Sequence, residues 1–153
     1  MTKITLTILL FIFGWFCSSP FEQIDATVQH FNAGRQMSGK SVQYQVKLIA
    51  NKPSRKITFE KMWVGTNPAT LKVYTLDENK QVSYTYKKGD TIYIDAYMNY
   101  RPNDKGVLEL VNNGLSNKVV EYQGEAYIEY SYKGNKKELI IENFRKLETV
   151  NYQ

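Results

Sequence analysis

The chain has 153 residues, 42% of them hydrophobic, and a formal net charge of +5 at pH 7, which is the size of one domain with its own core. One histidine and one cysteine cannot supply the three or four ligands of a Cys/His metal site, so that class of site is excluded, and we expect no metal and no cofactor. No run of lysine or arginine exceeds two residues, so a nucleic-acid partner is not expected either.

Residues 1–19, MTKITLTILLFIFGWFCSS, have the layout of a secretory signal peptide, because Lys3 precedes an unbroken apolar run that ends in small residues. As a helix the apolar run would measure about 21 Å, short of the ~30 Å hydrocarbon core of a bilayer, so a cleaved signal peptide is favoured over an uncleaved anchor. Cys17 could instead be lipidated and tether the chain to a membrane, although Phe16 stands where lipoprotein processing favours a small residue. We therefore predict an exported protein, periplasmic or associated with the outer membrane.

Residues 20–39 predict a short helix followed by a linker. Apolar residues recur there at spacings of three and four, as expected for one face of a helix of about three turns. They are Phe21, Ile24, Val28 and Phe31. His30 lies beside this stripe without a neighbouring serine and acid, so we interpret it as a surface or helix-end residue rather than a catalytic one.

The linker overlaps the string GRQMSGKS at residues 34–41, which matches the phosphate-binding pattern G-x-x-x-x-G-K-[ST]. A phosphate loop follows a buried strand and opens a helix, whose first amides hold the anion. After Lys40, however, apolar and polar residues alternate with a period of two, which predicts a strand. We therefore interpret the string as a connector and expect no nucleotide.

Residues 40–153 predict a mainly β domain, an antiparallel β-sandwich or a partly open barrel. Turn signals about ten residues apart separate roughly seven to nine short strands. The longest candidate is TIYIDAYMNY at residues 91–100, in which alternate residues define a core face and an outward face. The core face holds Ile92, Ile94, Ala96, Met98 and Tyr100, and the outward face holds Tyr93, Asp95, Tyr97 and Asn99.

The segment GVLELVNNGLSNKVVEY after this strand has two interpretations. It could form a hairpin that turns at Asn113-Gly114, or a short helix that begins at Asp104 and ends at Gly114. We favour the hairpin.

Tyrosine is the distinctive residue, with twelve copies. We predict that Tyr93, Tyr97, Tyr84 and Tyr86 form an exposed binding face, since aromatic strips can stack on a sugar ring or accept a protein strand. The alternative is ordinary cross-strand stabilisation of a sheet.

A carboxylate pair that cleaves sugars could come from Glu121, Glu125 and Glu129. Such spacings arise by chance among 15 acidic residues, so we predict that the protein is not an enzyme.

The leader, the strand GKSVQYQVKL, the segment FEKMWVG and the end GEAYIEYSYKGNKKELIIENF together resemble the small, mostly uncharacterised exported β-proteins and lipoproteins of Bacteroidota. This resemblance implies a location in the cell envelope and implies no catalytic residue. We predict a non-enzymatic envelope domain whose partner is an envelope protein or a glycan. The alternative is a carrier that holds a lipid or a lipoprotein chain in a half-barrel cavity.

Overall fold

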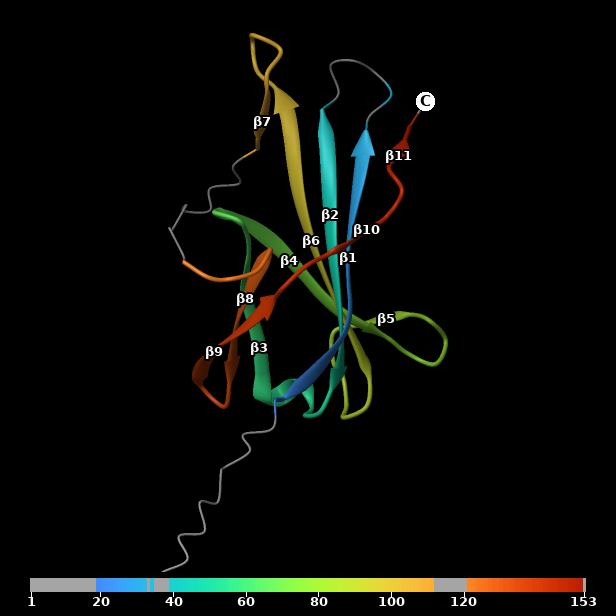
Figure 1. Cartoon of the computed structure of the whole chain (residues 1–153). Coiled ribbons are helices and arrows are strands. Elements are labelled where there is room, and N and C mark those ends of the chain that lie inside the picture. Colours follow the sequence, from blue (N-terminus) through green and yellow to red (C-terminus); the bar gives the residue numbers. More distant parts are fainter. Residues whose placement is uncertain (1–18, 33, 35–38, 112–120, 153) are drawn as a thin grey trace, which may run out of the picture.

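The computed structural model describes residues 19–32, 34, 39–111 and 121–152, which form a mainly β structure (Figure 1). The elements are β1 (Phe21–Asn32), β2 (Lys40–Ala50), the 3-10 helix η1 (Ser54–Lys56), β3 (Ile57–Val64), β4 (Asn67–Leu76), β5 (Val82–Ser83), β6 (Thr91–Pro102), β7 (Leu108–Leu110), β8 (Ala126–Tyr132), β9 (Asn135–Ile141), β10 (Arg145–Lys146) and β11 (Val150–Asn151). The strands make one curled, open half-barrel sheet in the order β10-β1-β2-β6-β4-β3-β8-β9. Nowhere in these residues is there a helix with the length and apolarity needed to cross a bilayer.

The sheet curls because β4 belongs to both of its halves. The first residues of β4 pair with β3, where Asn67 lies opposite Val64, and its later residues pair with β6, where Tyr74 lies opposite Tyr93. After β9 the chain crosses to the opposite edge, where β10 pairs in parallel with β1 (Figure 1). The C-terminal segment therefore joins the two ends of the curl.

The predicted helix over residues 20–39 is wrong, because β1 occupies Phe21–Asn32. The register between β1 and β2 slips by one residue at Ile24, which is the extra residue of a β-bulge and is 52% exposed. A bulge adds one residue to a strand and so shifts the alternation of its side chains by one position. Here the residues that face the core change from odd to even numbers. The buried apolar side chains are Phe21 before the bulge and Ala26 and Val28 after it. Of the four residues in the predicted helix stripe, Phe21 and Val28 face the core, whereas Ile24 is the bulged residue and Phe31 stacks on Tyr152, with ring centroids 6.2 Å apart.

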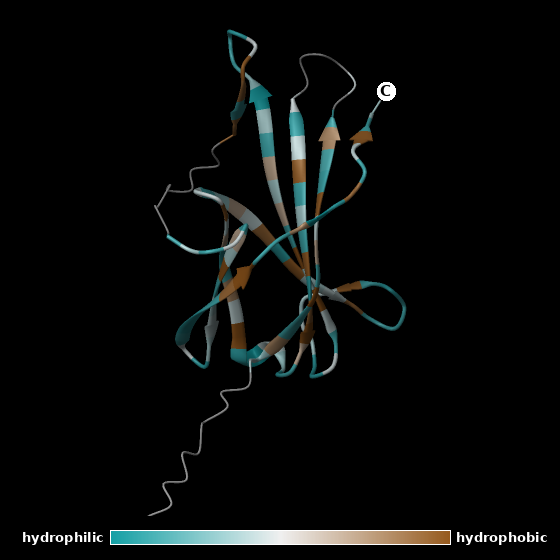
Figure 2. Cartoon of the chain, viewed as in Figure 1, coloured by the Kyte–Doolittle hydropathy of each residue, from teal (hydrophilic) through white to brown (hydrophobic). Residues whose placement is uncertain are grey.

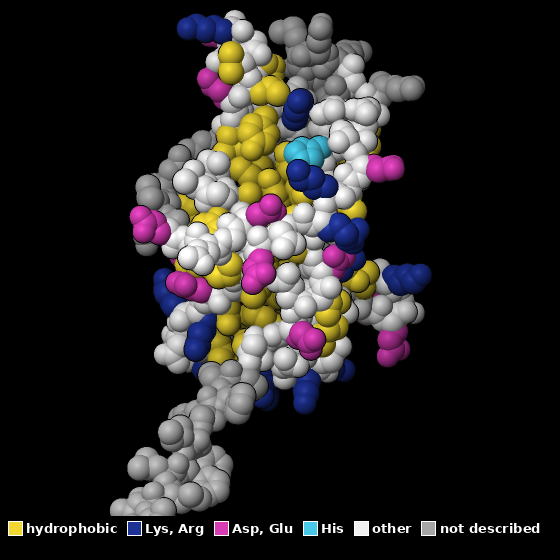
Figure 3. All heavy atoms as spheres, viewed as in Figure 1, with side chains coloured by type: hydrophobic (Ala, Val, Ile, Leu, Met, Phe, Trp, Pro, Cys, Tyr) yellow, Lys and Arg dark blue, Asp and Glu magenta, His cyan; other side chains and the backbone are white. Residues whose placement is uncertain are grey.

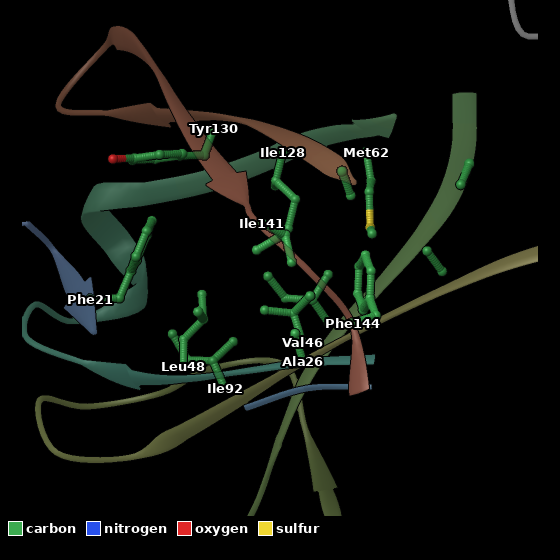
Figure 4. Close-up of a cluster of buried hydrophobic side chains, with 14 of the residues drawn as sticks. Phe21, Ala26, Val46, Leu48, Met62, Ile92, Ile128, Tyr130, Ile141 and Phe144 are labelled. Atoms are coloured by element: carbon green, nitrogen blue, oxygen red, sulfur yellow. The ribbon is translucent and has the colours of Figure 1, made fainter. Parts of the chain in front are cut away.

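The core lies on the concave side of the sheet and is filled by apolar side chains from both halves. In Figure 4, Ile128 and Ile141 of one half point toward Val46 and Leu48 of the other, and all four are fully buried. Burying a side chain of this size contributes about 1.5–3 kcal/mol. Phe144, between β9 and β10, is also buried and packs edge-on against Tyr44, with ring centroids 5.1 Å apart.

The strand predicted after the phosphate-loop string is confirmed, since β2 begins at Lys40 and its hydrophobic and hydrophilic residues alternate (Figure 2). No helix starts at Ser41. Gly39 has a φ of +82°, and a Cβ on it would collide with the carbonyl oxygen of Tyr100. This glycine therefore has a structural explanation in the close approach of two backbones, whereas residues 35–38 lie outside the described part.

The helix alternative for residues 104–114 is wrong, because β7 pairs antiparallel with β6 and forms a hairpin. The hairpin turns at residues 103–107, where Oδ1 of Asn103 accepts the backbone N–H groups of Lys105 and Val107 over 2.9 and 3.0 Å. Such local bonds favour a turn over a helix start. The predicted turn at Asn113-Gly114 lies outside the described residues, as do residues 1–18 with Cys17.

Candidate functional site

The outer face is the side of β1, β2, β6 and β4 that points away from the core. Since β6 lies between β2 and β4, each of its outward residues has a neighbour on both sides. From β2 through β6 to β4, the rows are Lys47, Tyr93 and Tyr74; Gln45, Asp95 and Lys72; and Gln43, Tyr97 and Thr70. On β1 the face continues with Asp25, Thr27 and Gln29. Polar and aromatic side chains therefore meet on one continuous surface.

Asp95 is the buried centre of the outer face, with only 4% of its surface exposed. The side-chain amide of Gln45 donates from Nε2 to Oδ1 over 2.9 Å, and the hydroxyl of Tyr74 donates to Oδ2 over 3.2 Å. A buried carboxylate is costly unless donors satisfy it. These two hydrogen bonds offset that cost and fix the positions of both donor side chains.

Tyr74 and Tyr93 form a stacked pair, with ring centroids 5.3 Å apart and planes inclined by 14°. Nζ of Lys47 lies 5.9 Å from the centroid of Tyr93, and Nζ of Lys72 lies 5.4 Å from that of Tyr74. Both distances are within the range of cation–π attraction. Burial, and after it the neighbouring Asp95, raise the pKa of Tyr74 to about 12. Its hydroxyl therefore stays protonated at neutral pH.

Tyr97 is the exposed aromatic residue of the outer face, with 41% of its surface accessible. Burial of the remainder and the charge of Asp95 raise its pKa, so it too is a neutral phenol. Gln43 lies beside Tyr97 in the register and also lines a shallow pocket of about 60 Å³. This volume exceeds the roughly 10–15 Å³ that a single water requires, so the pocket can hold a small polar group.

The charges on the β1 side of the outer face are paired. Oδ2 of Asp25 lies 2.9 Å from Nη2 of Arg145 and 3.9 Å from Nζ of Lys47. Exposed pairs of this kind contribute about 0–1 kcal/mol to stability. Their main consequence is that this side of the face presents little unpaired charge to a ligand.

Two of the four predicted tyrosines lie on the outer face and two do not. Tyr93 and Tyr97 point outward, as the alternation predicted. Tyr84 is 70% exposed but follows β5, outside the strands of the face. The prediction for Tyr86 is wrong, because this residue is 6% exposed and belongs to the core. The chain leaves the strand at Ser83, so alternation no longer decides which way the next side chains point.

The predicted carboxylates are used in different ways. Oε2 of Glu125 accepts the backbone N–H of Phe144 over 2.8 Å, so it holds the start of the C-terminal segment. Glu129 and Glu138 each lie 3.2 Å from the hydroxyl of Tyr127. Burial, and after it Glu129, raise the pKa of Tyr127, which makes it a protonated donor and a poor nucleophile. Glu121 and His30 are exposed.

The residues that the sequence interpretation missed are the partners of Asp95 and of Tyr93, chiefly Tyr74 and Gln45. A local signal for Tyr74 existed, because in LKVYTL the residues Lys72 and Tyr74 alternate with apolar ones and so point outward. Nothing local indicates that this strand lies beside β6. In the part of the chain that the structure describes, no group of three or more His, Cys, Asp or Glu side chains is arranged to hold a metal ion.

Comparisons with protein-family models, curated proteins and solved structures found no match for this chain. The functional interpretation therefore depends on the geometry of the described residues. That geometry offers neutral phenols, side-chain amides and a stacked aromatic pair, which are groups suited to binding.

Proposed function

We propose that this protein is a non-enzymatic binding domain of the cell envelope that recognises a glycan through the outer face. The observation that carries the proposal is one exposed aromatic ring, Tyr97, which lies between the neutral hydrogen-bonding side chains of Gln43 and Thr70 in its row. In this proposal the two halves of the curled sheet act as the layers of a sandwich, which keeps the outer face rigid.

The chemistry of the outer face suits sugar hydroxyls. Gln43 offers a carbonyl oxygen and an NH₂ group, so it can both accept and donate. Nε2 of Gln29 already donates to the backbone carbonyl of Glu148 and Nε2 of Gln45 to Asp95, which leaves each of these amides one further N–H and its carbonyl oxygen. Tyrosine combines an apolar ring face with a polar hydroxyl, which matches the alternation of C–H and O–H groups on a sugar. A ring stacked on Tyr97 could place a hydroxymethyl or acetamido substituent in the pocket beside Gln43.

A glycan fits the outer face better than a protein does. A stable protein interface buries about 800 Å² on each partner, and the centre of such an interface is depleted of charged residues. At the centre of the outer face stand Asp95, Lys47 and Lys72. An envelope protein as the partner remains an outcome that the experiment below distinguishes.

We do not extend the proposal to lipid carriage. A carrier requires room on the concave side of its half-barrel, and here side chains such as Leu48, Ile92 and Ile128 fill that side (Figure 4). Native mass spectrometry that found a lipid in the purified protein would reverse this preference.

The test is isothermal titration calorimetry of the purified full chain with a panel of soluble chito-, cello-, manno- and xylo-oligosaccharides. We expect at least one class to bind, and Tyr97→Ala to weaken that binding about tenfold, since loss of a stacked ring costs roughly 1.4 kcal/mol. Tyr84→Ala is the matched control, because it removes an even more exposed tyrosine outside the face. Binding that is equal in both variants, or capture of an envelope protein that depends on Tyr97, would contradict the proposal.

A further inference from the structure

A second surface feature, separate from the outer face, is the end of the molecule at which β1 begins, which we call the basic end. Four segments meet there. They are residues 19–22 at the start of the described chain, residues 51–56 after β2, residues 86–90 before β6, and the β8–β9 turn at residues 133–134. Figure 1 shows these segments together at the lower end of the molecule.

Backbone hydrogen bonds hold the four segments together. The N–H group of Asn51 donates to the carbonyl of Pro20 over 2.8 Å, and that of Ser54 donates to the carbonyl of Tyr86 over 3.0 Å. A third bond, of 3.0 Å, joins the β8–β9 turn to η1. The side chains of these segments therefore share one surface instead of lying on independent loops.

The basic end carries most of the excess positive charge of the protein. Its segments hold six lysine and arginine side chains against the carboxylates of Glu22 and Asp90, an excess of four where the whole chain has a net charge of +5. Figure 3 shows lysine and arginine side chains around this end. The six cations, all exposed or half-buried, are Lys52, Arg55, Lys56, Lys87, Lys88 and Lys133.

These charges are free to attract a partner. Among the described residues, no carboxylate forms an ion pair with any of the six. The opposite end of the molecule differs, because the β6–β7 hairpin over residues 101–109 carries two cations and two acids. The charge of the protein is therefore distributed unevenly along its long axis, and a negative surface would attract the basic end first.

An anionic lipid surface suits the chemistry of the basic end. Five of its six cations are lysines, whose ammonium groups act as point charges on flexible stems and lack the rigid fork with which arginine grips a single carboxylate or phosphate. The headgroup layer of an anionic membrane presents diffuse charge, and each lysine or arginine near it adds to the strength of binding.

The position of the N-terminal segment supplies the second argument for a membrane. The described chain begins at the basic end with Ser19, which follows Cys17 and the apolar run of the predicted leader by two positions. A tether at either place would hold this end toward the bilayer. One lipid chain alone binds a membrane reversibly, and a basic patch beside it makes the attachment stable.

We propose that the basic end binds the surface of a membrane that contains anionic phospholipids. The lysine and arginine side chains lie among the headgroups, and β1, β2 and β6 extend away from the membrane (Figure 1). The outer face remains accessible in this orientation, so the membrane contact is independent of the glycan site.

The test is co-sedimentation of the full chain with vesicles of phosphatidylcholine alone and with vesicles of equal parts phosphatidylcholine and phosphatidylglycerol. We expect tighter binding to the anionic vesicles, and an affinity that falls as salt is raised, because exposed charges are screened. Lys56→Gln combined with Lys88→Gln should weaken this binding roughly fivefold for each lysine, the equivalent of about 1 kcal/mol each.

The matched control is Lys40→Gln combined with Lys105→Gln. It removes two exposed lysines at the opposite end, one at the start of β2 and one in the β6–β7 hairpin. Because both double variants lower the net charge by the same amount, only the position of the lysines differs between them. We expect the control to bind anionic vesicles as the unchanged protein does.

Three results would overturn the proposal. Equal binding to both kinds of vesicle would show that the apolar leader alone makes the contact. An equal effect of the two double variants would show attraction to the net charge of the chain instead of to the basic end. A polyglutamate peptide that binds more tightly than the anionic vesicles, and that the variant at Lys56 and Lys88 no longer binds, would make an acidic protein the partner.

Discussion

Removal of the Tyr74 hydroxyl tests the hydrogen-bonded centre of the outer face. Tyr74→Phe keeps the ring that stacks on Tyr93 but removes the donor to Asp95, whose carboxylate is 4% exposed. A hydrogen bond to a charged group contributes about 1.5–3 kcal/mol. The O···O distance of 3.2 Å exceeds the usual range for hydroxyl donors, so we expect a loss near the lower limit, about 1.5 kcal/mol.

The assay is unfolding in urea, in which the midpoint should fall while the slope with denaturant stays constant. Tyr93→Phe is the matched control, since it removes one hydroxyl from the other ring of the stack, and no hydrogen bond of that hydroxyl is found among the described residues. We expect this control to change stability by less than about 0.5 kcal/mol.

Asp95→Asn provides the coupling measurement. If the Tyr74 hydroxyl acts through the carboxylate, Tyr74→Phe should cost less in the Asp95→Asn background than in the unchanged protein. Equal costs in both backgrounds, or a Tyr74→Phe variant as stable as Tyr93→Phe, would refute the reasoning. The carboxylate would then be satisfied by water rather than by the sheet.

Two further predictions concern alkaline pH and the C-terminal segment. Burial raises the pKa of Tyr74 and of Tyr86 to about 12, whereas the pKa of an unfolded tyrosine is about 10. The stability that comes from their protonated hydroxyls is therefore complete below about pH 10. It is lost as the pH rises toward about 12. The urea midpoint of unfolding should therefore decline above about pH 10, and it should decline less in Tyr74→Phe than in the unchanged protein. A midpoint that stays constant would contradict the raised pKa values of these tyrosines. Phe144→Ala should lower the free energy of unfolding by about 3 kcal/mol, because the buried ring packs on Tyr44. Hydrogen exchange should then rise first at the amide of Leu147, which donates to Val28 over 2.9 Å, and unchanged exchange there would show that Phe144 does not anchor the segment.

The alternation in residues 91–100 predicted both faces of β6 correctly. Ile92 and Ile94 are fully buried, and Tyr97 is exposed, because successive side chains of a strand must point to opposite sides of the sheet. The same local rule identified the strand after Lys40 and set aside the phosphate-loop pattern. A mainly β fold could therefore be predicted from the sequence.

The rule failed where the backbone departed from a regular strand. The bulge at Ile24 interrupts the alternation of β1, and the end of β5 at Ser83 made the direction of Tyr86 unpredictable. In both places one local irregularity changes which face the following residues occupy. The spacing of apolar residues along the sequence does not show where such an irregularity occurs.

By itself the sequence determined the regular strands, such as β2 and β6, and which of their side chains point toward the core, but it did not identify the bulged strand β1. Only the tertiary structure decided that β6 lies between β2 and β4, which brings Gln45 and Tyr74 to Asp95 from 50 and 21 residues away. The physical reason is that a repeat of two residues is a property of each strand alone. Strand order is instead decided by the packing of the whole core, and the outer face exists only as a product of that order.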